Sequence, residues 1–351
     1  MDATGRGGLL ASSVDQGIRY DERSTPEFQA ARLREACATV GCADGAWRHF
    51  ASNRNAELYR IGAADGSGAL LLKVLISKPA ETLEQEYRSL TDLHGIAQHT
   101  GKFRVPRPVA LFEGRSAYLM EWVDGSGLDA ELRGCPDPAS RLDVLHACGS
   151  AVAAVHHAWS RGSAPLDGEA LRRDLTCLPW AARPRERELV ERAVARIDGA
   201  SFPAARLYLD CDPVNVRLAG ASRTVVLLDP PERDVIDSVH WDLGAFLFGL
   251  HRLAWKWPPA ASRIRRAQPR MREAFLEGYA GPAALSSAPD RVLLALAELV
   301  RLAQLWSWWL RPLGFRHRAA GLGRAAYGYP LLARARRRAY RALGHTLDAA
   351  S

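Results

Sequence analysis

The chain has 351 residues, of which 48% are hydrophobic and 25% charged, enough to bury a sizeable core in one large or two modest domains. Glycine and proline are scattered, no repeat is visible, and no uninterrupted apolar run reaches about 18 residues, which excludes collagen-like, coiled-coil, repeat and membrane-spanning classes. The net charge of +8 comes from the C-terminal end, because no acidic residue lies between Glu298 and Asp348 whereas ten arginines do.

The N-terminus and the cysteines indicate the compartment. Residues 1–25 are polar and lack the basic and apolar regions of a secretory signal, so we expect a flexible arm. The six cysteines lie far apart and form no CxxC pair. We therefore expect reduced thiols, no zinc site and a cytoplasmic protein.

Strand patterns dominate the first part of the chain, after one helix. The expected elements are a helix over 26–40, strands over 47–50, 57–61 and 69–76, a helix over 78–94 and a strand pair over 105–123. The glycine-rich turn GAADGSG between the second and third strands is typical of a hairpin. This region is therefore predicted to be a small sheet with few helices.

After Gly125 the apolar residues recur mostly at helical spacing. Helices are expected over 142–158, 185–197, 242–255, 262–279, 291–310 and 331–347, with short apolar segments at 206–216 and 224–228. A strand-rich half followed by a larger helical half predicts an α+β, two-lobed fold. The expected domains are an arm over 1–25, an N-lobe over 26–123, a helical C-lobe over 124–310 and a basic extension over 311–351.

A lysine lies inside the most apolar of the predicted strands. Lys73 is flanked by leucines and valine in LLLKVL, and an ammonium in such a place must be paired or must bind an anion. Glu86, thirteen residues further on in the following helix, could supply the pairing charge. The alternative is a lysine of an edge strand that reaches solvent.

Three further polar residues interrupt apolar segments of the second half. Asp210 and Asn215 lie five residues apart across a proline-containing loop, and Asp229 closes the strand-like run VVLL. Together they provide a base and the hard oxygen ligands that magnesium-assisted phosphoryl transfer requires. Taken singly, each is better explained as the cap of a turn or helix, the usual role of such residues.

In this order, the residues resemble the aminoglycoside phosphotransferase and choline kinase-like branch of the protein-kinase-like fold. The resemblance covers roughly residues 26–310, and its most specific part is the D-x-x-x-x-N segment from Asp210 to Asn215 with Asp229 downstream. Asp242-Leu243-Gly244 occupies the place of the family's D-L-A helix. The resemblance implies a phosphotransferase that uses ATP and Mg²⁺ to phosphorylate a hydroxyl of a small, aminoglycoside- or sugar-like molecule.

The resemblance also implies a role for each residue. Asp210 would accept the proton of the acceptor hydroxyl, and Asn215 and Asp229 would hold Mg²⁺. Lys73 would reach the α- and β-phosphates of ATP, and Glu86 would fix its position.

Two more segments are assigned by resemblance, and three departures accompany them. The backbone near Glu121 and Val123 would bind adenine, and Ser52 and Asn53 would cover the phosphates in a turn that lacks glycine. The family's His-Gly before the catalytic aspartate is Tyr208-Leu209 here, and prolines follow Asp229. These departures keep open a catalytically silent nucleotide-binding pseudokinase.

The acceptor and the basic tail allow several interpretations. A polycationic acceptor would need carboxylates, for which the candidates are Asp210, Asp212, Glu232, Asp234 and Asp237. The tryptophans of LWSWWL followed by arginines are typical of packed final helices with a solvated face, or of contact with a membrane surface. In the second case the acceptor would be a lipid-linked or polysaccharide glycan at the membrane. No nucleic-acid partner is expected.

Overall fold

The computed structural model describes residues 26–41, 47–52, 56–62, 68–76, 80–112, 116–134, 137–176, 183–256, 261–281, 285, 287–310 and 329–350. Its contacts divide the chain into two compact units. We call Asp15–Glu131 with Val214–Asp234 the strand unit, and Leu132–Pro213 with Val235–Ser351 the helical unit. The predicted arm over 1–25 and the start of the basic extension, 311–328, lie outside the described residues.

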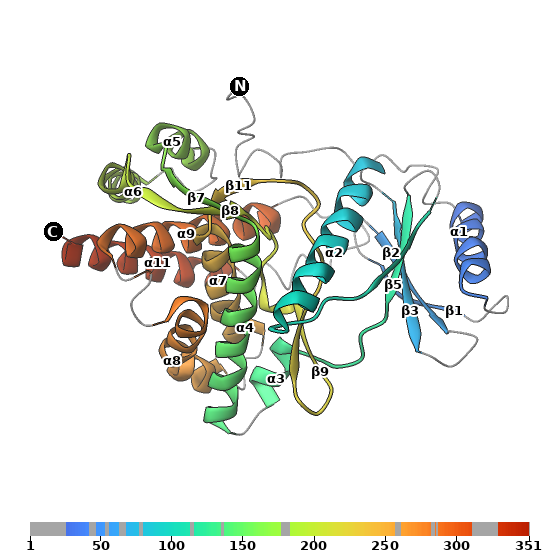
Figure 1. Cartoon of the computed structure of the whole chain (residues 1–351). Helices are drawn as coiled ribbons and strands as arrows, with labels where there is room; N and C mark the ends of the chain where they lie inside the picture. The colour runs from blue at the N-terminus through green and yellow to red at the C-terminus, as the bar shows by residue number, and fades with distance from the viewer. Residues whose placement is uncertain are drawn as a thin grey trace. The chain divides into compact units, whose positions relative to one another are not determined.

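The main sheet of the strand unit has five antiparallel strands in the order β1-β2-β3-β5-β4 and lies between two helices (Figure 1). Its elements are α1 (Pro26–Thr39), β1 (Trp47–Ser52), β2 (Ala56–Gly62), β3 (Ala69–Leu75), α2 (Ala80–Thr100), β4 (Pro108–Leu111) and β5 (Ala117–Glu121). Side chains alternate across a strand, so Leu70, Leu72 and Val74 of β3 pack in one core with Leu33 of α1. Lys73, which lies between them in sequence, therefore belongs to the opposite face.

A second, smaller sheet completes the strand unit. It contains β6 (Ser126–Gly127), β9 (Val216–Ala219) and β10 (Thr224–Leu227) in the order β10-β9-β6. A bridge between Arg104 and Val226 joins it to the segment before β4. Gly125 allows the close pairing, because a Cβ atom there would lie 2.3 Å from the Leu218 carbonyl oxygen. Residues 214–234 therefore group with the strand unit, although the sequence suggested one continuous lobe over 124–310.

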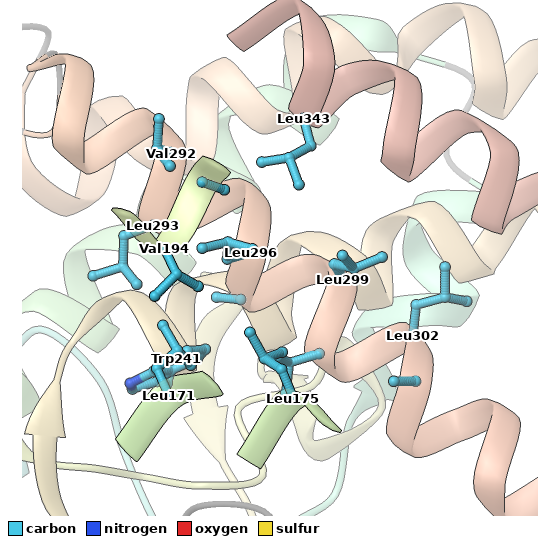
Figure 2. Close-up of a cluster of buried hydrophobic side chains, with 14 of the residues drawn as sticks. Leu171, Leu175, Val194, Trp241, Val292, Leu293, Leu296, Leu299, Leu302 and Leu343 are labelled. Carbon is cyan, nitrogen blue, oxygen red and sulfur yellow. The ribbon is translucent and has the colours of Figure 1, made fainter. Parts of the chain in front are cut away.

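The helical unit is built around one large apolar core. Its elements are α4 (Pro138–Ala158), β7 (Ser160–Pro165), α5 (Gly168–Thr176), α6 (Pro184–Ile197), β8 (Ser201–Arg206), β11 (Ile236–Ser238), α7 (His240–Lys256), α8 (Ala261–Ala280), α9 (Ala288–Leu310) and α11 (Tyr329–Ala350). The short helix α3 (Leu128–Gly134) contains the boundary between the two units. Leu296 and Leu299 of α9 meet Leu171 of α5 and Val194 of α6 in this core (Figure 2). Because α9 contributes to it along most of its length, α9 is the helix on which the unit is organised.

Most helices and the strands of the main sheet were predicted from sequence. The antiparallel sheet β11-β8-β7 and the helix α5 were not. The reason is local: β7 is the polar and mostly exposed segment SRGSAP, and β8 contains Pro203, a residue that argues against a strand. The α+β composition, with a strand-rich N-terminal part and a larger helical C-terminal part, agrees with the prediction.

The C-terminal helix α11 packs into the helical unit. Leu332, Leu343 and Leu347 belong to the large core, and Arg336 forms an ion pair with Glu186 of α6. Trp306 is partly buried against the same core. These contacts favour the interpretation of the tail as packed final helices. Within the described ranges, no helix combines the length and the apolar character needed to cross a membrane.

The crossing of α4 and α8 predicts a sharp response to a single methyl group. A Cβ atom at Gly149 would lie 2.0 Å from the Phe275 carbonyl oxygen, so Gly149→Ala must separate the two helices. We expect a loss of unfolding free energy of about 1–3 kcal/mol. Gly344→Ala on α11 is the control, because its nearest neighbour atom lies 3.9 Å away, and it should stabilise by about 0.5–1 kcal/mol. Equal melting temperatures for both variants would contradict this packing.

A partly buried histidine of α7 predicts how stability depends on pH. Burial lowers the pKa of His251 from 6.5 to about 4, against a hydrogen bond with Gln268 and with the help of arginines around it. The unfolded chain therefore takes up a proton at a higher pH than the native protein. Between pH 6.5 and 4, stability should fall as the pH falls, by about 2–3 kcal/mol from this group. Urea unfolding of His251→Gln should show a correspondingly shallower slope in this range.

Candidate active site

Lys73 is buried in the strand unit between two carboxylates. Its Nζ donates to Glu86 Oε2 at 2.6 Å and to Asp229 Oδ1 at 3.1 Å, and the lysine is only 8% exposed. Glu86 is supplied by α2, and Asp229 follows β10. Tyr118, which lies opposite Lys73 on β5, donates its hydroxyl to the same Glu86 oxygen at 3.4 Å. The structure thus brings Lys73, Glu86 and Asp229 together, and Lys73 lies in a central strand instead of an edge.

The carboxylates keep this lysine charged. Burial by itself would lower the pKa of Lys73, but the negative charges of Asp229 and Glu86 outweigh burial and raise the pKa well above its usual value. Burial raises the pKa of Tyr118, so its hydroxyl stays a hydrogen-bond donor. The result is a fixed ammonium next to Asp229, whose side chain is half-exposed at 49%.

Asn215 and Asp229 are positioned by one hairpin. Val216 of β9 pairs with Leu227 of β10, and the Leu228 amide donates to the Asn215 carbonyl oxygen at 2.8 Å. Asp229 follows with a positive φ of 58°, which turns the chain away from the strand. No group of three His, Cys, Asp or Glu within the described residues could hold a metal ion. Asn215 and Asp229 instead offer two hard oxygen donors, which fits Mg²⁺ because that ion commonly takes few protein ligands.

The segments predicted to contact nucleotide have their own contacts in the strand unit. The carboxylate of Glu121 accepts from Arg104 Nη2 at 2.8 Å, and its backbone amide donates to the Arg107 carbonyl oxygen. Val123 packs against Leu228, the residue before Asp229. The Ser52 hydroxyl donates to Glu57 at 2.6 Å across the β1–β2 hairpin. Asn53 lies outside the described residues.

A buried aspartate braces the segment before Asp210, in the helical unit. The amides of Tyr208 and Leu209 donate to Asp242 at 2.5 and 2.8 Å, and His156 of α4 approaches the same carboxylate at 3.0 Å. Leu209 adopts a positive φ of 69°, a conformation that glycine reaches without strain. Leucine therefore takes the backbone conformation that glycine adopts more readily, and two amide hydrogen bonds hold it there.

Each of the two aspartates in residues 210–212 has an arginine partner, and each arginine is supplied by a different helix. Arg301 of α9 donates its Nη2 to Asp210 Oδ1 at 2.5 Å. Arg252 of α7 donates its Nη2 to both carboxylate oxygens of Asp212, at 3.0 and 2.8 Å. The Asp210 side chain is 49% exposed and that of Asp212 only 4%. Asp212 thus forms a structural ion pair with Arg252, whereas the Asp210 carboxylate is open to solvent.

Sequence patterns did not reveal His156, Arg252 or Arg301 as neighbours of these carboxylates. His156 lies 86 residues before Asp242 in the chain, and its imidazole contacts the carboxylate of that bracing residue. Arg301 was counted among the C-terminal arginines, 91 residues from its partner. No spacing rule links residues so far apart, and only the packing of the helices shows the contacts.

The family model described as the phosphotransferase enzyme family matches residues 46–226, more than half of the chain. A comparison with curated proteins gives no match.

Solved structures resemble the chain over most of its length. A Ralstonia eutropha JMP134 protein, provisionally assigned as an aminoglycoside phosphotransferase, is 16% identical, covers 92% of this chain and 98% of its own, and has a TM-score of 0.58. Amicoumacin kinase hAmiN in complex with AMP-PNP, Ca²⁺ and Ami is 13% identical over 91% of this chain and 94% of its own, with a TM-score of 0.56. Macrolide 2′-phosphotransferase MphH from Brachybacterium faecium is 19% identical over 83% and 97%, with a TM-score of 0.50. At these identities the likeness establishes the fold, and it confirms the predicted fold class.

The buried lysine predicts strong energetic coupling with its carboxylate. Glu86→Gln and Lys73→Met should each destabilise the protein by about 3 kcal/mol, because each leaves a buried charge with one partner fewer. The double variant should lose less than the sum, with a coupling of about 1–3 kcal/mol in urea unfolding. The exposed pair Arg88–Glu84 on α2 is the control, and its coupling should stay below about 0.5 kcal/mol. Equal coupling in both cycles would contradict a special role for the buried pair.

Proposed function

The chain belongs to the phosphotransferase enzyme family, as its motifs predicted, and we propose that it transfers the γ-phosphate of ATP to a hydroxyl group of a small molecule. The observation that carries the proposal is the buried Lys73, held by Glu86 and Asp229. A fixed ammonium beside a half-exposed carboxylate is suited to bind the phosphates of a nucleotide. The hAmiN complex with AMP-PNP supports nucleotide use within this fold.

Within the strand unit, Lys73 would neutralise the α- and β-phosphates. Glu86 and the Tyr118 hydroxyl hold the lysine from α2 and β5, so its position does not depend on the ligand. The half-exposed Asp229 and Asn215 would hold Mg²⁺, which supplies positive charge to the phosphate oxygens. The backbone near Glu121 and Val123 would bind the adenine, and Ser52 and Asn53 would lie over the phosphates.

Asp210 would serve as the base for the acceptor hydroxyl. Its carboxylate is the exposed one of its segment, and its ionised form can accept a hydrogen bond from a hydroxyl and then its proton. Asp242 would act through the backbone, because it fixes the amides of Tyr208 and Leu209 just before Asp210. Asp242 is therefore a positioning residue.

These contacts favour catalysis over a silent nucleotide-binding scaffold. The departure Tyr208-Leu209 motivated the scaffold, yet Leu209 adopts a positive φ and its amide is bound by Asp242. His156 supplies an imidazole next to Asp242 from a different part of the chain. The glycan alternative at a membrane surface gains no support from α11, whose apolar face is part of the core.

Nucleotide binding should appear as thermal stabilisation. Mg·ATP at a hundred times its dissociation constant should stabilise the native state by about 2.7 kcal/mol. Asp229→Asn should lose the magnesium-dependent part of the shift, and Lys73→Met should lose most of it. Asp143→Asn, at an exposed position of α4, is the control and should respond as the wild type does. A wild type that shows no shift with Mg·ATP would contradict the proposal.

The role of Asp210 in turnover should be separable from nucleotide binding. Asp210→Asn keeps the size of the side chain and removes the proton acceptor, so turnover of Mg·ATP should fall by about 10²–10⁴-fold. The thermal shift with Mg·ATP should remain. Formation of ADP, with water or a hydroxyl compound as acceptor, is the measurement. Unchanged turnover in Asp210→Asn would exclude this residue as the base.

A further inference from the structure

The proposed base is already paired with a cation of its own unit. Arg301 Nη2 donates to Asp210 Oδ1 at 2.5 Å, and Arg301 Nη1 donates to Gln304 Oε1 at 3.2 Å. The side chains of Arg301 and Asp210 are 28% and 49% exposed, so both are accessible to a ligand from solvent. A molecule that approaches the Asp210 carboxylate therefore meets a guanidinium beside it.

The neighbouring carboxylates in the helical unit are engaged as well. Arg252 contacts both oxygens of Asp212. Asp237 accepts from the Ser238 amide at 2.6 Å and from the Trp241 indole at 3.1 Å. With Asp210, these are three of the five carboxylates that a polycationic acceptor would use, and the other two, Glu232 and Asp234, belong to the strand unit. Each of the three already has a cationic or N–H partner, which weakens its attraction for an ammonium group.

The net charge of the helical unit has the same sign. With lysine and arginine counted as +1 and aspartate and glutamate as −1, Leu132–Pro213 and Val235–Ser351 carry +11, whereas the strand unit carries −3. A unit with such an excess attracts anions and repels cations at long range. The local pair at Asp210 and the overall charge thus favour the same kind of ligand.

We propose that Arg301 selects the acceptor, and that the acceptor carries a phosphate or carboxylate group near the hydroxyl that is phosphorylated. The proposal rests on the phosphotransfer function and deepens it. A guanidinium is planar and has five N–H donors, so Arg301 can hold the Asp210 carboxylate and an acceptor anion at the same time. The same cation disfavours the amines of an aminoglycoside. The acceptor class is therefore an anionic hydroxyl compound.

The test compares sugars that share their hydroxyl groups and differ in charge. Thermal shifts of the full chain at pH 7 would be titrated with glucose, glucose 6-phosphate, glucuronate and glucosamine, with and without Mg·ADP. The wild type should bind the anionic sugars at least about tenfold more tightly than glucose, a difference of ~1.4 kcal/mol, and glucosamine least. This readout requires no turnover.

Three variants identify the residue responsible. Arg301→Gln should lose the preference for the anionic sugars, and Arg301→Lys should retain part of it. Arg341→Gln removes the same charge from an exposed position of α11 and should behave as the wild type does. A wild type without preference for the anions, a preference for glucosamine, or an unchanged preference in Arg301→Gln would each overturn the inference.

The sugar titrations, taken together with the separate Mg·ATP shift, keep this inference apart from the proposed function. A wild type that binds Mg·ATP without preferring anionic sugars supports the phosphotransferase and overturns the role of Arg301. A wild type that prefers anionic sugars through Arg301 but shows no shift with Mg·ATP contradicts the proposed function and leaves the charge selection in place.

Discussion

A buried ammonium is the constraint on which the strand unit depends. Lys73 lies inside an apolar strand, and leaving it unpaired there would cost several kcal/mol of solvation free energy. The fold meets this cost with Glu86 from α2 and Asp229 from the end of β10. One side chain thus ties together the main sheet, its covering helix and the small sheet. The same charge is the one that a nucleotide phosphate would use.

The helical unit contains a buried carboxylate, where the strand unit contains a buried ammonium. Asp242 is 1% exposed and accepts two backbone amides from the segment that leads to Asp210. The arrangement holds Leu209 in a backbone conformation that leucine rarely adopts, at a cost that two hydrogen bonds to the Asp242 side chain can offset. If Asp210 acts as the proposed base, rigidity of the segment before it would help, because proton transfer depends on a fixed direction of approach.

The arginines of the C-terminal part divide into structural and exposed ones. Arg336 is paired with Glu186 inside the helical unit, and Arg252 is paired with Asp212. Both arginines therefore have structural partners. Arg301 differs because its partner, Asp210, is half-exposed and belongs to the proposed chemistry. Among the described arginines between Glu298 and Asp348, Arg301 and Arg336 have carboxylate partners, whereas the others lie at exposed positions of α11: Arg334, Arg337, Arg338 and Arg341.

Local pattern and residue order in the sequence determined much of this protein. The apolar run around Lys73, the spacing from Asp210 to Asn215 and the position of Asp229 predicted the strands, the family and the site residues, because each signal lies within a few residues. The roles of those residues stay proposals. Only the tertiary structure decided the partners: residues 214–234 group with the strand unit, His156 meets Asp242, and Arg301 meets Asp210 across 91 positions. Such contacts depend on helix packing, and no periodicity of the chain encodes them.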